Sequence, residues 1–273
     1  MLEASLAGLF GLLIGSFLNV CIYRLPRDLS VVRPRSYCPQ CEKPIVWSDN
    51  IPLVSYFLLG RRCRHCRQTI PARYPIVEAL TGALFFLFVA ALGPTLEALK
   101  YCFLSALLTG MIFSDLEELI LPDEFTLGGL AAGLALSWVV PVRDGASEFI
   151  FTIMGSSLRG PRLSLAEAAI GAAVPAAFLW LTGELFHRIR HKEGLGFGDV
   201  KMIAAVGAFI GLAGVLRTLI LGSLMGSVFG IAYVLLARKD HKTYELPFGS
   251  FLGAAAILVI LFDQRVFTLL GPK

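Results

Sequence analysis

Charged residues are scarce in this sequence. Of its 273 residues only 16% are charged, whereas 56% are hydrophobic, and the mean hydropathy is +0.73. A soluble domain carries about 25% charged residues. The composition therefore excludes an ordinary soluble globular protein and indicates a chain that crosses a membrane several times. The net charge of +4 is too small to indicate a partner by itself.

Several familiar motifs are also missing. The first apolar segment has no basic start and no A-x-A cleavage site, so we expect a retained membrane helix and not a removed signal peptide. Four histidines and no nucleophile elbow give no convincing Ser-His-Asp triad. No glycine-rich nucleotide fingerprint occurs in a strand-turn-helix context. The residues alone thus support neither a serine hydrolase nor a nucleotide-binding domain.

Long apolar runs are present, and they predict an all-α polytopic membrane protein with about eight transmembrane helices. Residues 202–237 fit either two short spans or one span plus a re-entrant piece. The patterns "GAFIG" and "GSLMG" space small residues four apart, which favours close helix packing. The predicted spans lie near 4–23, 76–93, 98–114, 125–141, 165–186, 202–214, 215–237 and 248–270.

The basic residues orient these spans. Residues 24–75 contain ten Lys and Arg, residues 187–201 contain four and residues 238–247 contain three, together 17 of the 24 in the chain. With eight spans these three loops share one face, which the positive-inside rule makes cytoplasmic, with both termini outside. The connection at 142–163 then lies outside, either on the membrane surface or as a partly inserted hairpin.

The first basic loop carries four cysteines at metal-ligand spacing. Cys38-x2-Cys41 is followed after 21 residues by Cys63-x2-Cys66. Two such turns complete a tetrahedral site that suits Zn²⁺, and neighbouring arginines favour the thiolate form. Four sulfurs leave no position for water, so the predicted metal is structural. Four unrelated thiols or a redox pair are the alternatives.

The same loop raises the question of other partners. An arginine-rich zinc loop can bind nucleic acid, but these charges also serve orientation and contact with anionic lipid. We therefore expect membrane lipid and no nucleic acid as a partner. Cys21 and Cys102 fall inside apolar runs and are expected to be small core residues. The chain divides into a first helix (1–23), a cytoplasmic zinc-binding domain (24–75) and a membrane-embedded domain (76–273).

Two aspartates mark the ends of different spans on the cytoplasmic face. Asp115 ends the third span in "FSDLEELILPDE", and Asp199 stands in "GLGFGDVK" at the start of a later one. Ionisable groups at the edge of the hydrocarbon are costly and indicate function. Two close carboxyl groups in a low dielectric share one proton and can activate a water molecule, as in aspartic proteolysis. The glycines before Asp199 let backbone or substrate approach closely.

A purely structural interpretation of both aspartates is also open. Asp199 would then cap the following helix, and Asp115 would be an interfacial charge that ends a span. Asp123 is expected to cap a helix or support the adjacent loop. Glu117, Glu118 and Glu124 are expected to form a solvated face.

Together these stretches resemble the type IV prepilin peptidases, the bifunctional leader peptidases and N-methyltransferases of pilus and type II secretion systems. The resemblance spans most of the chain: "GSFLNVCIYRLP" at 15–26, the paired C-x-x-C loop, "DLEELILPD" at 115–123, "GLGFGDVKMIAAVGAFIG" at 194–211 and "PFGSFLGAAA" at 247–256. It implies that Asp115 and Asp199 are the catalytic pair. It also implies that Cys38, Cys41, Cys63 and Cys66 bind zinc.

The resemblance further implies a reaction. A short basic leader is cleaved from a prepilin or pseudopilin after a glycine, at the cytoplasmic face of the bacterial inner membrane. The new N-terminus is then methylated with S-adenosyl-L-methionine as the methyl donor. The zinc loop and its junction, including Glu78, are the segments expected to contribute to methylation. We also expect Glu117, Glu118, Asp123 and Glu124 to attract the basic leader.

One departure from the family pattern stands close to the proposed chemistry. Family members often read "PFGP" where this chain reads "PFGS", so Ser250 replaces proline. We expect a local change at a helix start that does not touch the aspartates. Three other interpretations remain: an intramembrane G-x-G-D protease for other substrates, a peptidase without methylation, and a non-enzymatic assembly factor that recruits a partner through the zinc loop.

Overall fold

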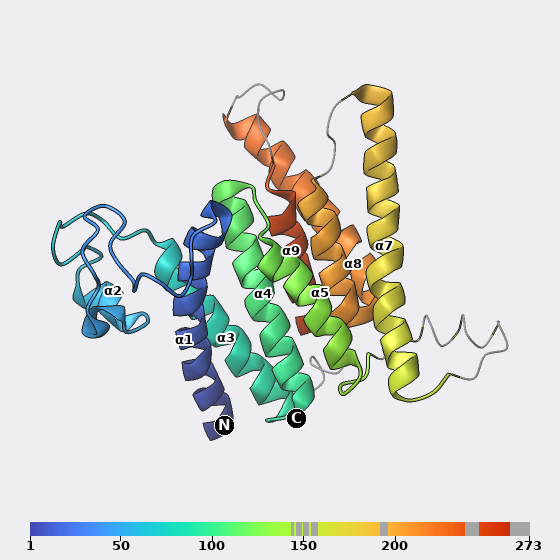
Figure 1. Cartoon of the computed structure of the whole chain (residues 1–273), viewed down its shortest axis with the longest axis horizontal. Coiled ribbons are helices and arrows are strands. Elements are labelled where there is room, and N and C mark those ends of the chain that lie inside the picture. The colour runs from blue at the N-terminus through green and yellow to red at the C-terminus, as the bar shows by residue number, and fades with distance from the viewer. Residues whose placement is uncertain are drawn as a thin grey trace.

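The computed structural model is built from helices (Figure 1). It describes residues 1–142, 158–191, 196–237 and 246–262, together with residues 145, 149 and 153. Within these residues there is no strand beyond two isolated bridges, so the predicted all-α class is confirmed. The long helices are α1 (Leu2–Arg24), α3 (Arg73–Leu92), α4 (Leu96–Glu118), α5 (Asp123–Ser137), α7 (Pro161–Arg190), α8 (Phe197–Ala237) and α9 (Phe248–Leu261).

Five helices are long and apolar enough to cross a membrane. They are α1, α3, α4, α7 and α8. Helix α5 has 15 residues and the described part of α9 has 14. At 1.5 Å per residue each is about 20 Å long, which is shorter than a hydrocarbon core of about 30 Å. The last predicted span extended to residue 270, and its end lies outside the described residues, as does most of the 142–163 connection.

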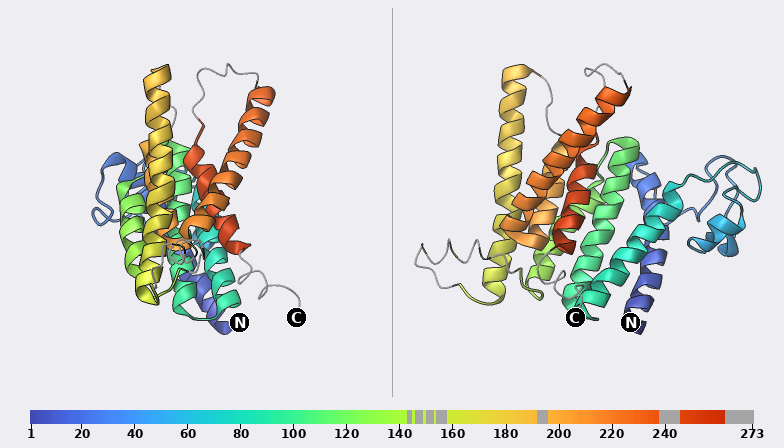
Figure 2. Two further views of the ribbon diagram at one scale, coloured as in Figure 1. Left: turned by 90° about the vertical axis from the view of Figure 1, so that its right-hand side faces the viewer. Right: turned by 180° about the vertical axis from the view of Figure 1, so that it is seen from behind.

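A break at Gly211 divides α8 into two helical pieces. Gly211 has φ 75° and ψ −176°, a backbone conformation that glycine adopts without steric cost. Figures 1 and 2 show the chain turning at this break, so that the second piece runs back beside α9. Either two short spans, at 202–214 and 215–237, or one span plus a re-entrant piece was expected here, and the break at Gly211 comes shortly before the first predicted boundary.

The helices alternate in direction, and this places the functional segments on one side of the bundle. Helix α1 packs on α3, α4 packs between α3 and α9, and α8 contacts α5, α7 and α9. In Figure 1 the C-terminal ends of α1, α4 and α7 point to the same side as the N-terminal ends of α5 and α9. The predicted common face of the basic loops is consistent with this arrangement.

The polarity of the bundle suits a lipid environment. Leu6, Leu9 and Leu13 form an exposed apolar row on α1. Small polar residues are buried instead: the hydroxyls of Thr81 and Thr109 each donate to a helix carbonyl at 2.8 Å. Internal satisfaction of polar groups combined with an apolar outer surface is what the bilayer requires.

Glycines allow the helices to approach closely, as the small-residue patterns predict. A Cβ atom at Gly207 on α8 would lie 2.0 Å from the carbonyl oxygen of Gly171 on α7. Gly222, in the second pattern, lies against Leu252 of α9, where a Cβ atom would come within 2.8 Å of its side chain. Both contacts exclude even a methyl group at the present helix separation.

We predict that Gly207→Ala destabilises the bundle, because α7 and α8 must separate to admit the methyl group. Overpacking of this kind costs about 1–3 kcal/mol, or a fall in Tm of about 3 °C or more in detergent. Gly128→Ala is the control, since a Cβ atom there meets nothing within 4 Å. Equal Tm values for the two variants would contradict the packing described.

Candidate active site and metal centre

Asp115 and Asp199 are both buried where helix ends meet. Asp115 lies in the last turn of α4 and is 6% exposed, and Asp199 lies in the first turn of α8 and is 9% exposed. Asp199 is the third residue of its helix, and its N–H points to the carbonyl of Gly196 at 3.1 Å. It is therefore not the N-cap residue, and Asp115 is not a solvated interfacial charge.

Gly249, at the start of α9, brings the two carboxyl groups to one point. A Cβ atom at this glycine would lie 3.0 Å from Oδ1 of Asp199 and 3.2 Å from Oδ2 of Asp115. These two distances set an upper limit of about 6.2 Å between the oxygens. Only glycine leaves the space between them open. The predicted meeting of the two aspartates is thus present in the structure.

Gly198, directly before Asp199, allows close packing. A Cβ atom at Gly198 would lie 3.2 Å from the Cβ of Leu121, which belongs to the turn between α4 and α5. Leu121 itself is buried and also lies against Gly249. A side chain at residue 198 would push Leu121 away from the pair. Residues 192–195, which complete the glycine-rich stretch, lie outside the described residues.

Ser250 contacts Asp115 directly, so the expectation that residue 250 does not touch the aspartates is wrong. Its backbone N–H donates to Oδ2 of Asp115 at 2.6 Å, and its Oγ lies 2.8 Å from the same oxygen. The first turn of α9 is laid across the last turn of α4, which the sequence pattern alone does not show. Among the described residues, none donates a hydrogen bond to the carboxyl group of Asp199.

Most of the acidic residues near Asp115 and Asp199 form ion pairs with basic residues of this protein. Glu118 pairs with Arg27, Glu117 with Arg73 and Asp123 with Lys201. We expected these acidic residues to attract the basic leader because of their excess negative charge. The ion pairs compensate most of that charge, and Glu117 and Glu118 are paired and not a free solvated face. These pairs instead connect the start of the loop, α3 and α8 to the α4–α5 corner.

The four predicted metal ligands form one cluster. The sulfurs of Cys38, Cys41, Cys63 and Cys66 all lie within 4.8 Å of one another. Each C-x-x-C forms a tight hairpin, in which the N–H of the first cysteine points to the carbonyl of the residue five further on, at 3.0 Å for Cys38 and 2.9 Å for Cys63. Isolated bridges close both hairpins. The residue directly after the second cysteine of each pair, Glu42 or Arg67, has a positive φ.

The cluster fits a zinc ion. Ligands at a Zn–S distance of about 2.3 Å in a tetrahedron have sulfurs about 3.8 Å apart, and Cys38 and Cys66 are separated by 3.9 Å. All four cysteines are free thiols. The backbone N–H of Cys66 points to the Cys63 sulfur and lowers the pKa of Cys63, while the pKa of the neighbouring Cys66 is raised. The four thiols thus do not ionise independently, and a metal that binds them takes them as thiolates. Cys21 and Cys102 are buried core residues, as predicted.

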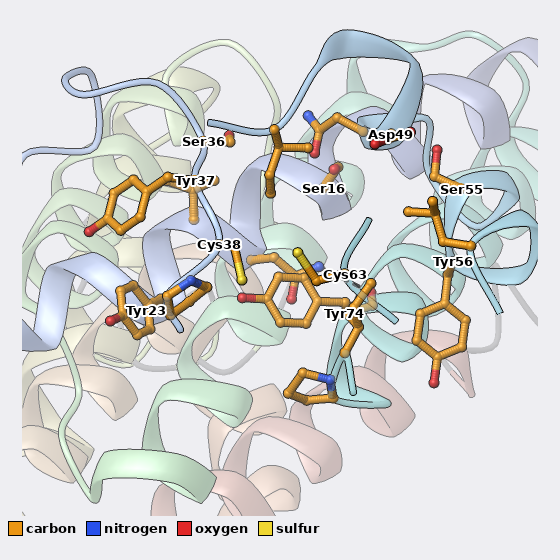
Figure 3. Close-up of a pocket in the computed structure, with 18 of the residues that line it drawn as sticks. Ser16, Tyr23, Ser36, Tyr37, Cys38, Asp49, Ser55, Tyr56, Cys63 and Tyr74 are labelled. Carbon is orange, nitrogen blue, oxygen red and sulfur yellow. Dashed lines mark hydrogen bonds between the residues drawn. The ribbon is translucent and has the colours of Figure 1, made fainter. Parts of the chain in front are cut away.

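A cavity of about 510 Å³ lies between the zinc loop and helices α1 and α3. Tyr23, Tyr37, Tyr56 and Tyr74 line it from four different segments, and Figure 3 shows their side chains around the cavity. Cys38 and Cys63 also line it, so the metal cluster borders the cavity. The meeting of the four tyrosines was not predicted, because residues this far apart in the chain give no local pattern.

Two buried polar atoms in the cavity wall lack a partner. Asn19 is 2% exposed, and its Nδ2 donates to the carbonyl of Tyr74 at 3.0 Å, while its Oδ1 has no hydrogen bond. The Nε of Arg73 also has none. Glu78 is buried and accepts from the N–H of Leu53 at 2.8 Å. Unsatisfied buried groups beside a cavity are expected where a ligand or water supplies the missing bond.

Two known protein families match successive parts of this chain. Residues 9–92 match the bacterial peptidase A24 N-terminal domain, and residues 102–231 match the type IV leader peptidase family. The first match contains most of α1, the zinc loop and α3, and the second contains both aspartates. The class is therefore that of the membrane-embedded leader peptidases.

Curated relatives agree over nearly the whole chain. A prepilin leader peptidase/N-methyltransferase of Aeromonas salmonicida (strain A449) is 35% identical, covering 96% of this chain and 91% of the relative. Proteins of the same name from Myxococcus xanthus (strain DK1622) and Burkholderia pseudomallei (strain 1026b) are 38% and 32% identical, covering 88% and 99% of this chain, and 67% and 89% of the relatives. This chain belongs to the type IV leader peptidase family. No solved structure gives a significant match.

We predict about one zinc ion per chain in the purified protein. A Cys38→Ser/Cys66→Ser double variant should retain less than about a tenth of that metal, because two sulfurs cannot hold it tightly. Metal content by mass spectrometry is the measurement, and Cys102→Ser is the control because its buried thiol lies in α4, outside the cluster. A wild-type protein without zinc after purification in zinc-supplemented buffer would refute the assignment.

Proposed function

We propose that this protein removes the leader peptide of prepilins or pseudopilins with Asp115 and Asp199, and methylates the new N-terminus. The observation that carries the proposal is the meeting of the two buried carboxyl groups at Gly249. The names of the curated relatives supply the substrate class and the second activity. Cleavage after a glycine follows from the family resemblance.

The chemistry follows from placing two carboxyl groups in a low dielectric. They cannot both carry a charge easily, so one proton is shared between them. The ionised carboxylate takes a proton from a water molecule, whose oxygen attacks the scissile carbonyl. The other carboxyl gives its proton to the carbonyl oxygen. Collapse of the tetrahedral intermediate returns that oxygen to a carbonyl, breaks the C–N bond and delivers a proton to the leaving amine.

The location of the pair suits a substrate that arrives through the membrane. The C-terminal ends of α1 and α7, each of which leads into a basic loop of the sequence, point to the same side of the bundle as the end of α4 that carries Asp115. The positive-inside rule makes that side cytoplasmic. A prepilin with an apolar helix in the bilayer and a basic leader in the cytoplasm then presents its scissile bond at this depth. We propose the bacterial inner membrane as the location. The closed four-sulfur site serves as a structural support for the loop.

We assign the methyl donor, S-adenosyl-L-methionine, to the cavity beside the zinc cluster. When bound, it supplies an electrophilic methyl group. The tyrosine rings suit its adenine and its sulfonium cation, Arg73 suits its carboxylate, and Glu78 and Asn19 suit its amino group. The volume of about 510 Å³ lies within the range of small-molecule pockets. The unpartnered Oδ1 of Asn19 supports a polar ligand.

We predict that Asp115→Asn and Asp199→Asn each lower the rate of leader cleavage about 10²–10⁴-fold, because neither amide can take part in proton transfer. The measurement is cleavage of a purified prepilin in detergent, with product masses read. Gly249→Ala should give a similar loss, because its methyl group fills the space between the carboxyls. Methylation of a pre-cleaved pilin should survive in all three variants and serves as the folding control.

Full cleavage by either asparagine variant would reject the aspartyl mechanism and favour the assembly-factor interpretation. Cleavage of unrelated membrane substrates in preference to prepilins would favour a general intramembrane protease. A wild-type product that lacks the added methyl mass would indicate a peptidase without methylation.

We predict that Glu78→Gln weakens binding of S-adenosyl-L-methionine about 10-fold or more, since a hydrogen bond to a charged group contributes about 1.5–3 kcal/mol. Equilibrium dialysis with radiolabelled methyl donor measures this without relying on activity. Glu167→Gln is the matched control, because Glu167 is also buried but lies in α7, away from the cavity. Unchanged binding by Glu78→Gln would remove the cavity assignment and leave the peptidase proposal standing.

A further inference from the structure

Ser250 hydrogen-bonds to Asp115 through both its backbone and its side chain. It lies in the first turn of α9, is 6% exposed, and both its N–H and its Oγ reach Oδ2 of Asp115, at 2.6 and 2.8 Å. Donors in the first turn of a helix have no full intrahelical partner, and the N–H of Ser250 is otherwise directed only at the carbonyl of Pro247, at 3.2 Å. Asp115 therefore receives two donors from one residue of another helix.

The hydroxyl of Ser250 has a second acceptor within reach. Its Oγ lies 3.0 Å from the carbonyl oxygen of Ile112, one turn before Asp115 on α4. A hydroxyl carries one hydrogen and two lone pairs, so it donates to one of these acceptors at a time. The structure thus places a single rotatable hydrogen between the carbonyl of Ile112 and the oxygen of Asp115 that lies against Gly249.

These two acceptors match the two protonation states of Asp115. When Asp115 is ionised, the hydroxyl and the N–H of Ser250 both donate to Oδ2. When Oδ2 is protonated, its O–H can donate to Oγ, and the serine hydrogen then turns to the carbonyl of Ile112. Each state keeps Oγ hydrogen-bonded, and the change requires only the rotation of one hydroxyl group.

Asp199 has a different environment. It is similarly buried, no described residue donates to its carboxyl group, and the charge that acts on it is that of Asp115. Hydrogen bonds to a carboxylate favour the charged form. The asymmetry between the two carboxyls thus follows from Ser250, which belongs to neither helix that carries them.

We propose that Ser250 is a positioning residue of the peptidase reaction, which keeps the negative charge of the pair on Asp115 and leaves the shared proton on Asp199. This inference rests on the proposed function. It assigns Asp115 as the base that takes the proton of the attacking water, and Asp199 as the acid that protonates the scissile carbonyl. As the proton reaches Oδ2, the serine hydroxyl rotates to Ile112. A proline at residue 250 would offer neither donor.

The test is steady-state leader cleavage by Ser250→Ala and Ser250→Thr in detergent. Loss of the hydroxyl in Ser250→Ala should lower kcat about tenfold and leave KM within about twofold, because the bond acts on Asp115 and not on the substrate. Ser250→Thr keeps the hydroxyl and should restore kcat to within about threefold of wild type. Methylation of a pre-cleaved pilin should be unchanged in both variants.

Ser105→Ala is the matched control, because it removes another buried serine hydroxyl on α4 that donates to a helix carbonyl at 2.8 Å, several turns from Asp115. Its kcat should equal that of wild type. Wild-type kcat in Ser250→Ala, no rescue by threonine, or a parallel fall in methylation would each overturn the inference. Asp115→Asn in the same assay separates the two levels: if it also cleaves normally, the proposed function itself fails.

Discussion

The burial of two carboxyl groups around one glycine is the constraint on which the rest of this structure depends. Taking carboxyl groups out of water is costly unless they are neutralised or hydrogen-bonded, and Asp115 and Asp199 are both more than nine-tenths buried. Three helices must end or begin at one place to hold them: α4 brings Asp115, α8 brings Asp199, and α9 brings Gly249. The glycines at 198 and 249 keep side chains out of the space that remains.

The zinc loop is tied to this centre through α1 and α3. Arg24 is buried at the end of α1 and donates to the carbonyls of Ser30 at 2.8 Å and Arg35 at 3.3 Å, which fixes the start of the loop. The loop ends at Arg73, whose guanidinium pairs with Glu117 near the end of α4. The metal cluster, the cavity and the aspartate pair therefore share a continuous framework, although each has its own chemistry.

Much of this arrangement could be predicted from the sequence, and the reasons are physical. The cysteine cluster was predictable because two C-x-x-C hairpins each orient their own sulfurs locally. The meeting of Asp115 and Asp199 was predictable because counting the membrane spans from the N-terminus places both helix ends on the same face. The contact between Ser250 and Asp115 was not, since it depends on how α9 crosses α4, and the family pattern suggested only a change at a helix start. The ion pairs of Glu117 and Glu118 were missed because their partners, Arg73 and Arg27, are far away in the chain.

The central claim is that Asp115 and Asp199 act as one catalytic unit. The measurement that tests it most directly is a double-mutant cycle on kcat/KM for leader cleavage, with Asp115→Asn, Asp199→Asn and the double variant measured in long single-turnover reactions. Residues that act as a unit give non-additive losses, so we expect the double variant to be no slower than the slower single variant, within about threefold. Losses that multiply, as for two independent groups, would contradict a shared proton and a single site.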